Sequence, residues 1–252
     1  ESGSQTMLDV MEKKFQVEDI KKALFACHDI GLNSPPLGFM LGMPGESLKT
    51  AKESGKLMGE IAAHLKIPTG LIYKHNDLLY TIPLIGTPVY EYGKQLGLIG
   101  QSTDEEEKFL EITSNVGAFK RYYINFNGAP MSEVIFWDML VFLEATRSYE
   151  KLMKNKTENK ELKQKYINQN NAQVLNPHVK AKQNKIRKIE VMGAVTEINI
   201  PISQYFITNF VKEHIVFNKM IARLPRFLVY PIVRYALYFE YLIQKKLFKD
   251  SN

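Results

Sequence analysis

The chain has 252 residues, of which 45% are hydrophobic and 11% aromatic, so it can bury a sizeable core as one large domain or two small ones. These proportions exclude an intrinsically disordered protein. One cysteine, Cys27, excludes an internal disulfide, a multi-thiolate metal site and a complete iron-sulfur site within this chain, and it favours a cytoplasmic location.

The net charge of +6 is unevenly distributed along the chain. Residues 1–150 carry 14 basic and 20 acidic side chains, whereas residues 151–190 carry 11 and 3. Residues 212–252 are again basic, with 8 and 3. This division indicates an acidic to neutral globular part, followed by a basic region that could face phosphates or anionic lipid.

Helical and strand patterns alternate over the first hundred residues. Ser4, Ser47 and Thr87 are placed to cap helices at their N-termini, and glycines follow the apolar stripes at the C-termini. Alternating strands and helices predict parallel βα units with helices outside. In chain order the elements are two helices within residues 4–15 and 17–31, a short strand within 36–43, a helix over 48–65, a strand within 77–84 and a helix over 88–96.

Three loops in this part contain small and polar residues at the expected ends of strands. They read ESGS at residues 1–4, GMPGES at 42–47 and IPLIGTP at 82–88. In parallel α/β sheets, ligands bind where strands end and helices begin. Glycines there allow a backbone to approach a ligand closely. The alternative for each loop is an ordinary turn or helix cap without a ligand.

Beyond residue 100 the strand–helix alternation stops, and the pattern is mainly helical. Residues 103–116 and 130–155 predict helices, the second mostly apolar on one side. The segment 151–190 is polar and rich in Lys, Asn and Gln. We interpret it as a solvated linker or loop insertion in preference to a nucleic-acid-binding patch, because Tyr166 is its only aromatic residue for stacking on a base.

Aromatic, aliphatic and basic residues are mixed in the last segment, from residue 214 onward. Pro231, Arg234 and Glu240 interrupt its apolar run, which argues against a membrane-spanning helix. Two interpretations stay open. The segment is either a helix at the surface of an anionic membrane, or a helix pair packed on the rest of the protein.

The three loops lie in the stretches ESGSQTMLDVMEKKF, GFMLGMPGES and IPLIGTPVYEYGKQLGLI. In this order and spacing, these stretches resemble the second half of the radical S-adenosylmethionine barrel, in the subgroup with a cobalamin-binding domain. The resemblance covers about residues 1–100. It implies an α/β fold: the second half of a partial (β/α)6 TIM-like barrel, followed by a mainly helical C-terminal region. The family holds a [4Fe-4S] cluster on a CxxxCxxC loop. We expect that loop and three βα units to precede Glu1 in the parent protein, and the subgroup usually carries a cobalamin-binding domain in front of them.

The resemblance also implies which residues contact S-adenosylmethionine. Glu1 and Ser2 match polar positions after the fourth strand, and Lys13 matches a basic residue placed against the methionyl carboxylate. The family spaces a glycine and a glutamate three residues apart in the next turn, whereas Gly42 and Glu46 are four apart. The full set of expected cofactor-binding residues is Glu1, Ser2, Lys13, Gly42, Pro44, Gly45, Glu46, Ile82 and Pro83.

The resulting hypothesis is that this chain is the C-terminal part of a radical S-adenosylmethionine enzyme. The intact enzyme would perform methyl transfer or radical rearrangement on an unidentified substrate, and the chain alone would be inactive. The alternative is a non-catalytic module that binds a membrane surface or RNA through its basic C-terminal region. Either is compatible with a cytoplasmic, membrane-associated protein. The expected organisation is a half barrel over 1–100, a helical extension over 101–155, a basic polar linker or insertion over 156–190 and a helical, basic and aromatic region over 191–252.

Overall fold

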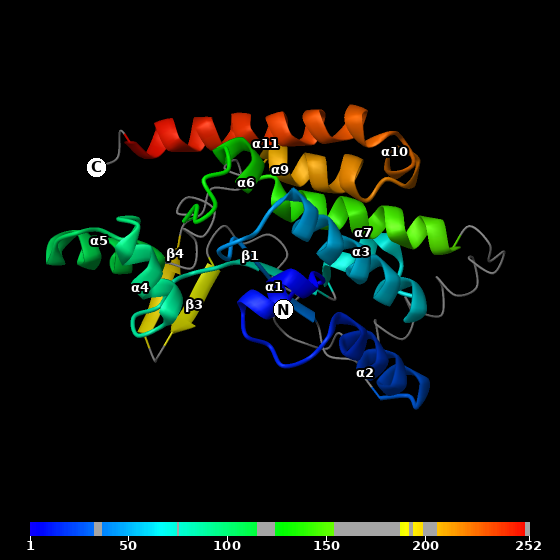
Figure 1. The fold of residues 1–252 in the computed structure, drawn as a ribbon. Helices are drawn as coiled ribbons and strands as arrows, with labels where there is room; N and C mark the ends of the chain where they lie inside the picture. The colour runs from blue at the N-terminus through cyan, green and yellow to red at the C-terminus, as the bar shows by residue number, and fades with distance from the viewer. Residues whose placement is uncertain are drawn as a thin grey trace.

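The computed structural model shows a mostly helical α/β protein (Figure 1). It describes residues 1–32, 37–74, 76–114, 124–153, 187–191, 194–198 and 206–249. The elements before residue 100 are α1 (Gln5–Val10), α2 (Val17–Asp29), β1 (Leu37–Leu41), α3 (Leu48–His64), the 3-10 helix η1 (Thr69–Lys74), β2 (Asn76–Tyr80) and α4 (Pro88–Gln95). The later elements are α5 (Thr103–Ser114), α6 (Met131–Val134), α7 (Trp137–Met153), β3 (Arg187–Val191), β4 (Ala194–Ile198), α9 (Phe206–Val211), the π-helix η5 (Lys212–Val216), α10 (Lys219–Ala222) and α11 (Arg226–Lys249).

Strands β1 and β2 pair in parallel, as the alternating pattern predicts. Their register places Phe39 opposite Leu78 and Leu41 opposite Tyr80. Phe39 and Leu41 are buried against the helices, while Leu79, on the other face, is 58% exposed. The described strands therefore form two separate two-stranded sheets, and no barrel is shown by this part of the chain.

Helices α3 and α7 lie side by side above β1 and contain most of the core (Figure 1). Two glycines set their separation. A Cβ atom on Gly55 would lie 2.5 Å from the carbonyl oxygen of Val141, and one on Gly59 would lie 2.3 Å from that of Ala145. Both distances are shorter than any real Cβ contact, so a larger residue at either position would push the helices apart.

Helices α9, α10 and α11 form a further layer over α7 (Figure 1). Glu144 of α7 is buried and accepts two hydrogen bonds from the guanidinium of Arg226, at 2.7 and 3.0 Å, and another from the Tyr230 hydroxyl. One turn and a half further on, Glu150 pairs with Lys219 and Arg223. These two carboxylates fix the turn between α10 and α11 onto α7.

Most helices and both parallel strands lie where the sequence predicts them. The Ser47 hydroxyl accepts from the Thr50 amide and that of Thr87 from the Tyr90 amide, as expected of N-caps, whereas Ser4 precedes α1 without a side-chain cap hydrogen bond. Gly31 and Gly97 adopt positive φ after α2 and α4. The long helix expected over 130–155 is divided into α6 and α7. The sequence did not anticipate the antiparallel pair β3–β4. Most of the expected linker, residues 154–186, lies outside the described residues.

The glycine contact between α3 and α7 generates a first prediction. Gly59→Ala should lower the free energy of unfolding by about 1–3 kcal/mol, because overpacking against backbone exceeds the gain in helix propensity. Urea denaturation measures this change.

Gly70→Ala is the matched control, because a Cβ there meets no atom within 4 Å. It should change stability by less than about 0.5 kcal/mol. Equal stability of the two variants would show that α3 and α7 are not in close contact.

Candidate functional site

Three segments distant in sequence lie side by side at the parallel strands. The Met40 amide donates to the Glu1 carbonyl at 2.8 Å, and the Thr81 amide donates to the Leu41 carbonyl at 2.7 Å. Neighbouring residues of a strand direct their backbone polar groups to opposite edges. Residue 1 and β2 therefore flank β1 on opposite sides, which brings the three loop motifs to one region of the sheet.

The turn after β1 has a fixed backbone conformation. Gly42 and Gly45 have φ of 80° and 89°, values that disfavour any residue with a side chain. Asn127 holds the turn from outside: its amide oxygen accepts from the Gly45 amide at 2.6 Å and its amide nitrogen donates to the Met43 carbonyl at 3.1 Å. This side chain preorganises the turn, although it is more than eighty residues away in sequence.

The N-terminal ESGS segment lies directly on α3. A Cβ on Gly3 would lie 2.5 Å from the Cα of Ser54, so only glycine fits there. The Ser54 hydroxyl accepts from the Gly3 amide at 2.9 Å and lies 3.2 Å from the Ser2 hydroxyl, which in turn accepts from the Ser4 amide. Ser2 and Ser4 are fully buried, and the Ser4 hydroxyl has no hydrogen-bond partner among the described residues.

Glu46 directly precedes Ser47, the N-cap residue of α3, and its carboxyl is buried without a cationic partner among the described residues. It is 3% exposed, its Oε1 contacts the Thr50 hydroxyl, and its Oε2 has no hydrogen-bond partner in the described chain. Burial raises the pKa of Glu46 to about 7, although the hydrogen bond from Thr50 opposes the shift. The Thr50 hydroxyl is also 2.9 Å from the Ser47 carbonyl, and it has one hydrogen to donate. A proton on Glu46 would let both contacts form at once.

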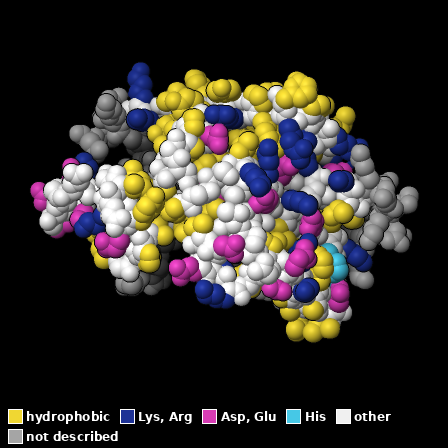
Figure 2. All heavy atoms as spheres, in the orientation of Figure 1, with side chains coloured by type: hydrophobic (Ala, Val, Ile, Leu, Met, Phe, Trp, Pro, Cys, Tyr) yellow, Lys and Arg dark blue, Asp and Glu magenta, His cyan; other side chains and the backbone are white. Residues whose placement is uncertain are grey.

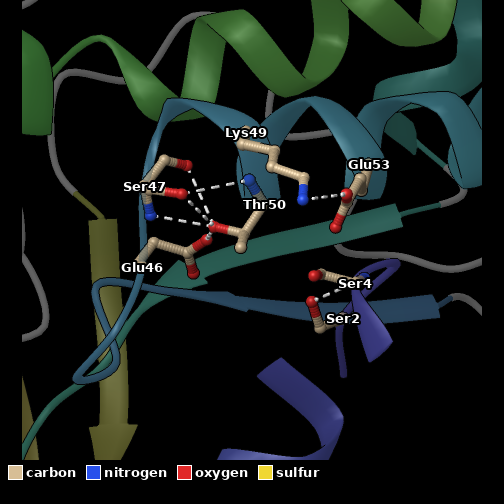
Figure 3. Close-up of polar contacts among 7 residues, drawn as sticks. All are labelled: Ser2, Ser4, Glu46, Ser47, Lys49, Thr50 and Glu53. Atoms are coloured by element: carbon tan, nitrogen blue, oxygen red, sulfur yellow. Dashed lines mark hydrogen bonds and ion pairs between the residues drawn. The ribbon is translucent and has the colours of Figure 1, made fainter. Parts of the chain in front are cut away.

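Figure 3 shows these residues as two neighbouring groups, Glu46 with Ser47 and Thr50, and Ser2 with Ser4. Thr50 and Ser54 are four residues apart on α3 and both are buried, so they face the same side of the helix. One face of α3 thus carries a buried polar row that runs from Glu46 towards the N-terminal segment.

Glu1 and Lys13 form an ion pair at 2.9 Å, with side chains 44% and 31% exposed. Both were expected at the cofactor site, and α1 brings them together across twelve residues of sequence. The Lys13 ammonium has three donors, so one bond to Glu1 leaves it able to bind a second carboxylate. The exposed position makes the pair accessible to a ligand.

The remaining expected site residues lie in the same two turns. Pro44 is half-buried within the turn after β1, and Ile82 and Pro83 follow β2, half-buried and buried respectively. Sequence reasoning missed Asn127, Thr50 and Ser54. The last two could have been found from their spacing with Glu46 on one helical face, whereas no local pattern relates Asn127 to a turn so far away in sequence.

The residues of this chain do not fit an iron-sulfur cluster. Cys27 is half-buried in α2, and the described residues contain no group of three His, Cys, Asp or Glu side chains able to hold a metal ion. Comparisons of the chain with protein-family models, with curated proteins and with solved structures found no match.

The raised pKa of Glu46 generates a prediction on stability. The folded protein holds the Glu46 proton more tightly than the unfolded chain, whose carboxyl titrates near its ordinary value of 4.5. The folded state is thus destabilised as the pH rises from about 4.5 to 7, by up to about 3 kcal/mol. Glu46→Gln removes this loss, so its stability relative to the parent should rise between pH 5 and 8 in urea denaturation.

Glu91→Gln, at an exposed position of α4, is the control and should show no such dependence. A pH-independent difference between Glu46→Gln and the parent would contradict a raised pKa.

Proposed function

We propose that this chain forms part of the S-adenosylmethionine pocket of a radical S-adenosylmethionine enzyme. The observation that carries the proposal is the meeting of the three motif segments at one region of β1 and β2, through the backbone hydrogen bonds of Met40 and Thr81. Ligands of parallel α/β folds bind at such strand ends.

The faces of the sheet support a barrel origin for the two strands. Phe39 and Leu41 pack under α3 and α7, whereas Gly38 and Asp77 are exposed on the opposite face together with Leu79. Parallel strands are normally buried on both faces. In the proposed half barrel the exposed face is the inner one, and the rest of the parent protein covers it.

Several groups of this chain fit the chemical features of S-adenosylmethionine. Lys13 would pair with the methionyl carboxylate by a charge-assisted hydrogen bond, and Glu1 would keep Lys13 in position. The positive-φ turn at Gly42 and Gly45 lets the ligand approach the backbone closely. The unpartnered Ser4 hydroxyl and Glu46 Oε2 are further polar atoms of this region without a described partner.

When bound in such enzymes, S-adenosylmethionine supplies either a 5′-deoxyadenosyl radical or, with cobalamin, a methyl group. Residues of this chain would bind and orient it, while Glu46 would hold a proton near neutral pH. The cluster ligands would come from the remainder of the parent protein, because this chain has one cysteine.

A direct consequence is that the isolated chain should not assemble a cluster. Anaerobic reconstitution with iron and sulfide should leave no stoichiometric [4Fe-4S] absorbance, and S-adenosylmethionine should not be cleaved. A stoichiometric cluster signal would contradict this assignment of the ligands.

The pocket itself is tested by calorimetric titration of the chain with S-adenosylmethionine. We expect saturable binding that Lys13→Ala weakens by about 1–3 kcal/mol, nearer the lower figure because the ion pair is partly exposed.

Lys14→Ala removes a neighbouring exposed cation with no described ion pair and should leave the affinity unchanged. Absence of saturable binding, or equal effects of the two variants, would remove this region from the proposed pocket.

A further inference from the structure

Helix α11 carries two apolar stripes on opposite sides. Val229, Val233 and Leu237 are between 0 and 5% exposed and pack into the core. A second series with helical spacing faces solvent, with exposed fractions between 43 and 61%; it consists of Leu228, Ile232, Tyr235, Phe239 and Leu242. The outward stripe extends over about 20 Å at 1.5 Å per residue.

Further apolar side chains extend this surface to the beginning of the helix. Met220, Leu224 and Phe227, at the turn between α10 and α11, are 78, 45 and 74% exposed. Figure 2 shows hydrophobic side chains along the edge formed by α10 and α11, with Lys and Arg side chains beside them. A continuous apolar surface of this kind marks an interaction site rather than scattered exposed residues.

The charges of α11 distinguish between possible partners. Its sole acidic residue, Glu240, is buried and accepts hydrogen bonds from the Ile207 and Thr208 amides, so it caps α9 and does not reach the surface. Lys245 and Lys246 are exposed, and neither has an ion pair with a described carboxylate. The outward surface of α11 is therefore apolar and cationic without an opposing negative charge.

The cations at the other end of the helix have a different role. Arg226 and Arg223 are bound by Glu144 and Glu150 of α7, so they anchor the helix instead of contributing free positive charge. The free charge thus lies at the C-terminal part of the outward stripe, where Lys246 follows Phe239 by two helical turns.

We infer that the outward face of α11 docks on an anionic lipid bilayer, lying in the plane of the membrane surface. Its aromatic and aliphatic residues enter the headgroup boundary, and its lysines meet lipid phosphates. None of the described helices combines the length and apolarity needed to cross a bilayer. A protein partner would need a matching acidic and apolar groove, whereas an anionic bilayer supplies both features over the whole stripe. This inference is independent of the proposed cofactor pocket.

Vesicle co-sedimentation tests the inference, with phosphatidylcholine alone or with about one third phosphatidylglycerol. The full chain should bind the anionic vesicles at low salt and detach at high salt, because Lys contacts with lipid are screened. Lys245→Ala/Lys246→Ala should weaken binding roughly twenty-five-fold, at about a fivefold loss for each cation. Ile232→Ser/Phe239→Ser should weaken it at least about tenfold through lost apolar burial.

Matched control variants remove exposed apolar side chains or lysines at positions away from α11. Ile30→Ser/Leu32→Ser deletes two side chains, 74 and 57% exposed, at the end of α2, and should bind as the parent does. Lys14→Ala/Lys22→Ala is the corresponding charge control.

A tryptophan probe separates docking of this face from binding elsewhere. The chain has one tryptophan, Trp137, and it is fully buried. Tyr235→Trp should show a blue-shifted emission that brominated lipids quench, whereas Tyr92→Trp on α4 should not.

Four results would overturn the inference: no binding to anionic vesicles at low salt, equal loss in the α2 and α11 variants, an unquenched Tyr235→Trp probe, or assembly of the chain into dimers that the Ile232→Ser/Phe239→Ser variant abolishes. If single-stranded RNA displaces the vesicles and lipid does not quench the Tyr235→Trp probe, the surface binds nucleic acid instead.

Discussion

The close contact of α3 with α7 is the constraint on which the other parts of the structure depend. Gly55 and Gly59 remove the Cβ atoms that would otherwise meet the carbonyls of Val141 and Ala145. The backbones can then approach each other, and the large side chains on either side of the contact interdigitate. A helix pair fixed in this way is a rigid element, on which both the strands and the C-terminal helices can be positioned.

Each helix of this pair holds a different part of the chain in place. Through Ser54, α3 holds the ESGS segment, whose Gly3 can lie on the helix only because it has no side chain. Through Glu144, α7 holds Arg226 and Tyr230 of α11. The candidate cofactor region and the outward apolar stripe are therefore positioned by the same helix pair, although they use different residues and opposite sides of it.

Local sequence patterns predicted the elements well but could not predict how they meet. Ser47 and Thr87 cap their helices because capping depends on residues within one turn. The parallel pairing of β1 with β2 also followed from the alternating order. Asn127 bonds to Gly45 and Glu144 bonds to Arg226, and each pair is more than eighty residues apart in sequence. No helical or strand periodicity relates residues at that separation. The mixed composition of the last segment left the packed and membrane-surface interpretations both open. In the structure, one apolar stripe of α11 packs into the core and a second stripe is exposed.

Three buried glutamates show how a structural carboxylate differs from a candidate functional one. Burial alone would raise the pKa of Glu144, but the hydrogen bonds from Arg226 and Tyr230 keep it below its ordinary value. Glu240 accepts from the backbone at the start of α9. Both charges are thus compensated by groups that tie helices together. Glu46 receives a threonine hydroxyl and no described cation, and its pKa rises to about 7. Of these three carboxyls, Glu46 thus keeps the largest uncompensated cost of burial, since only a hydroxyl and backbone groups oppose its pKa shift, and this makes it the candidate for a functional role.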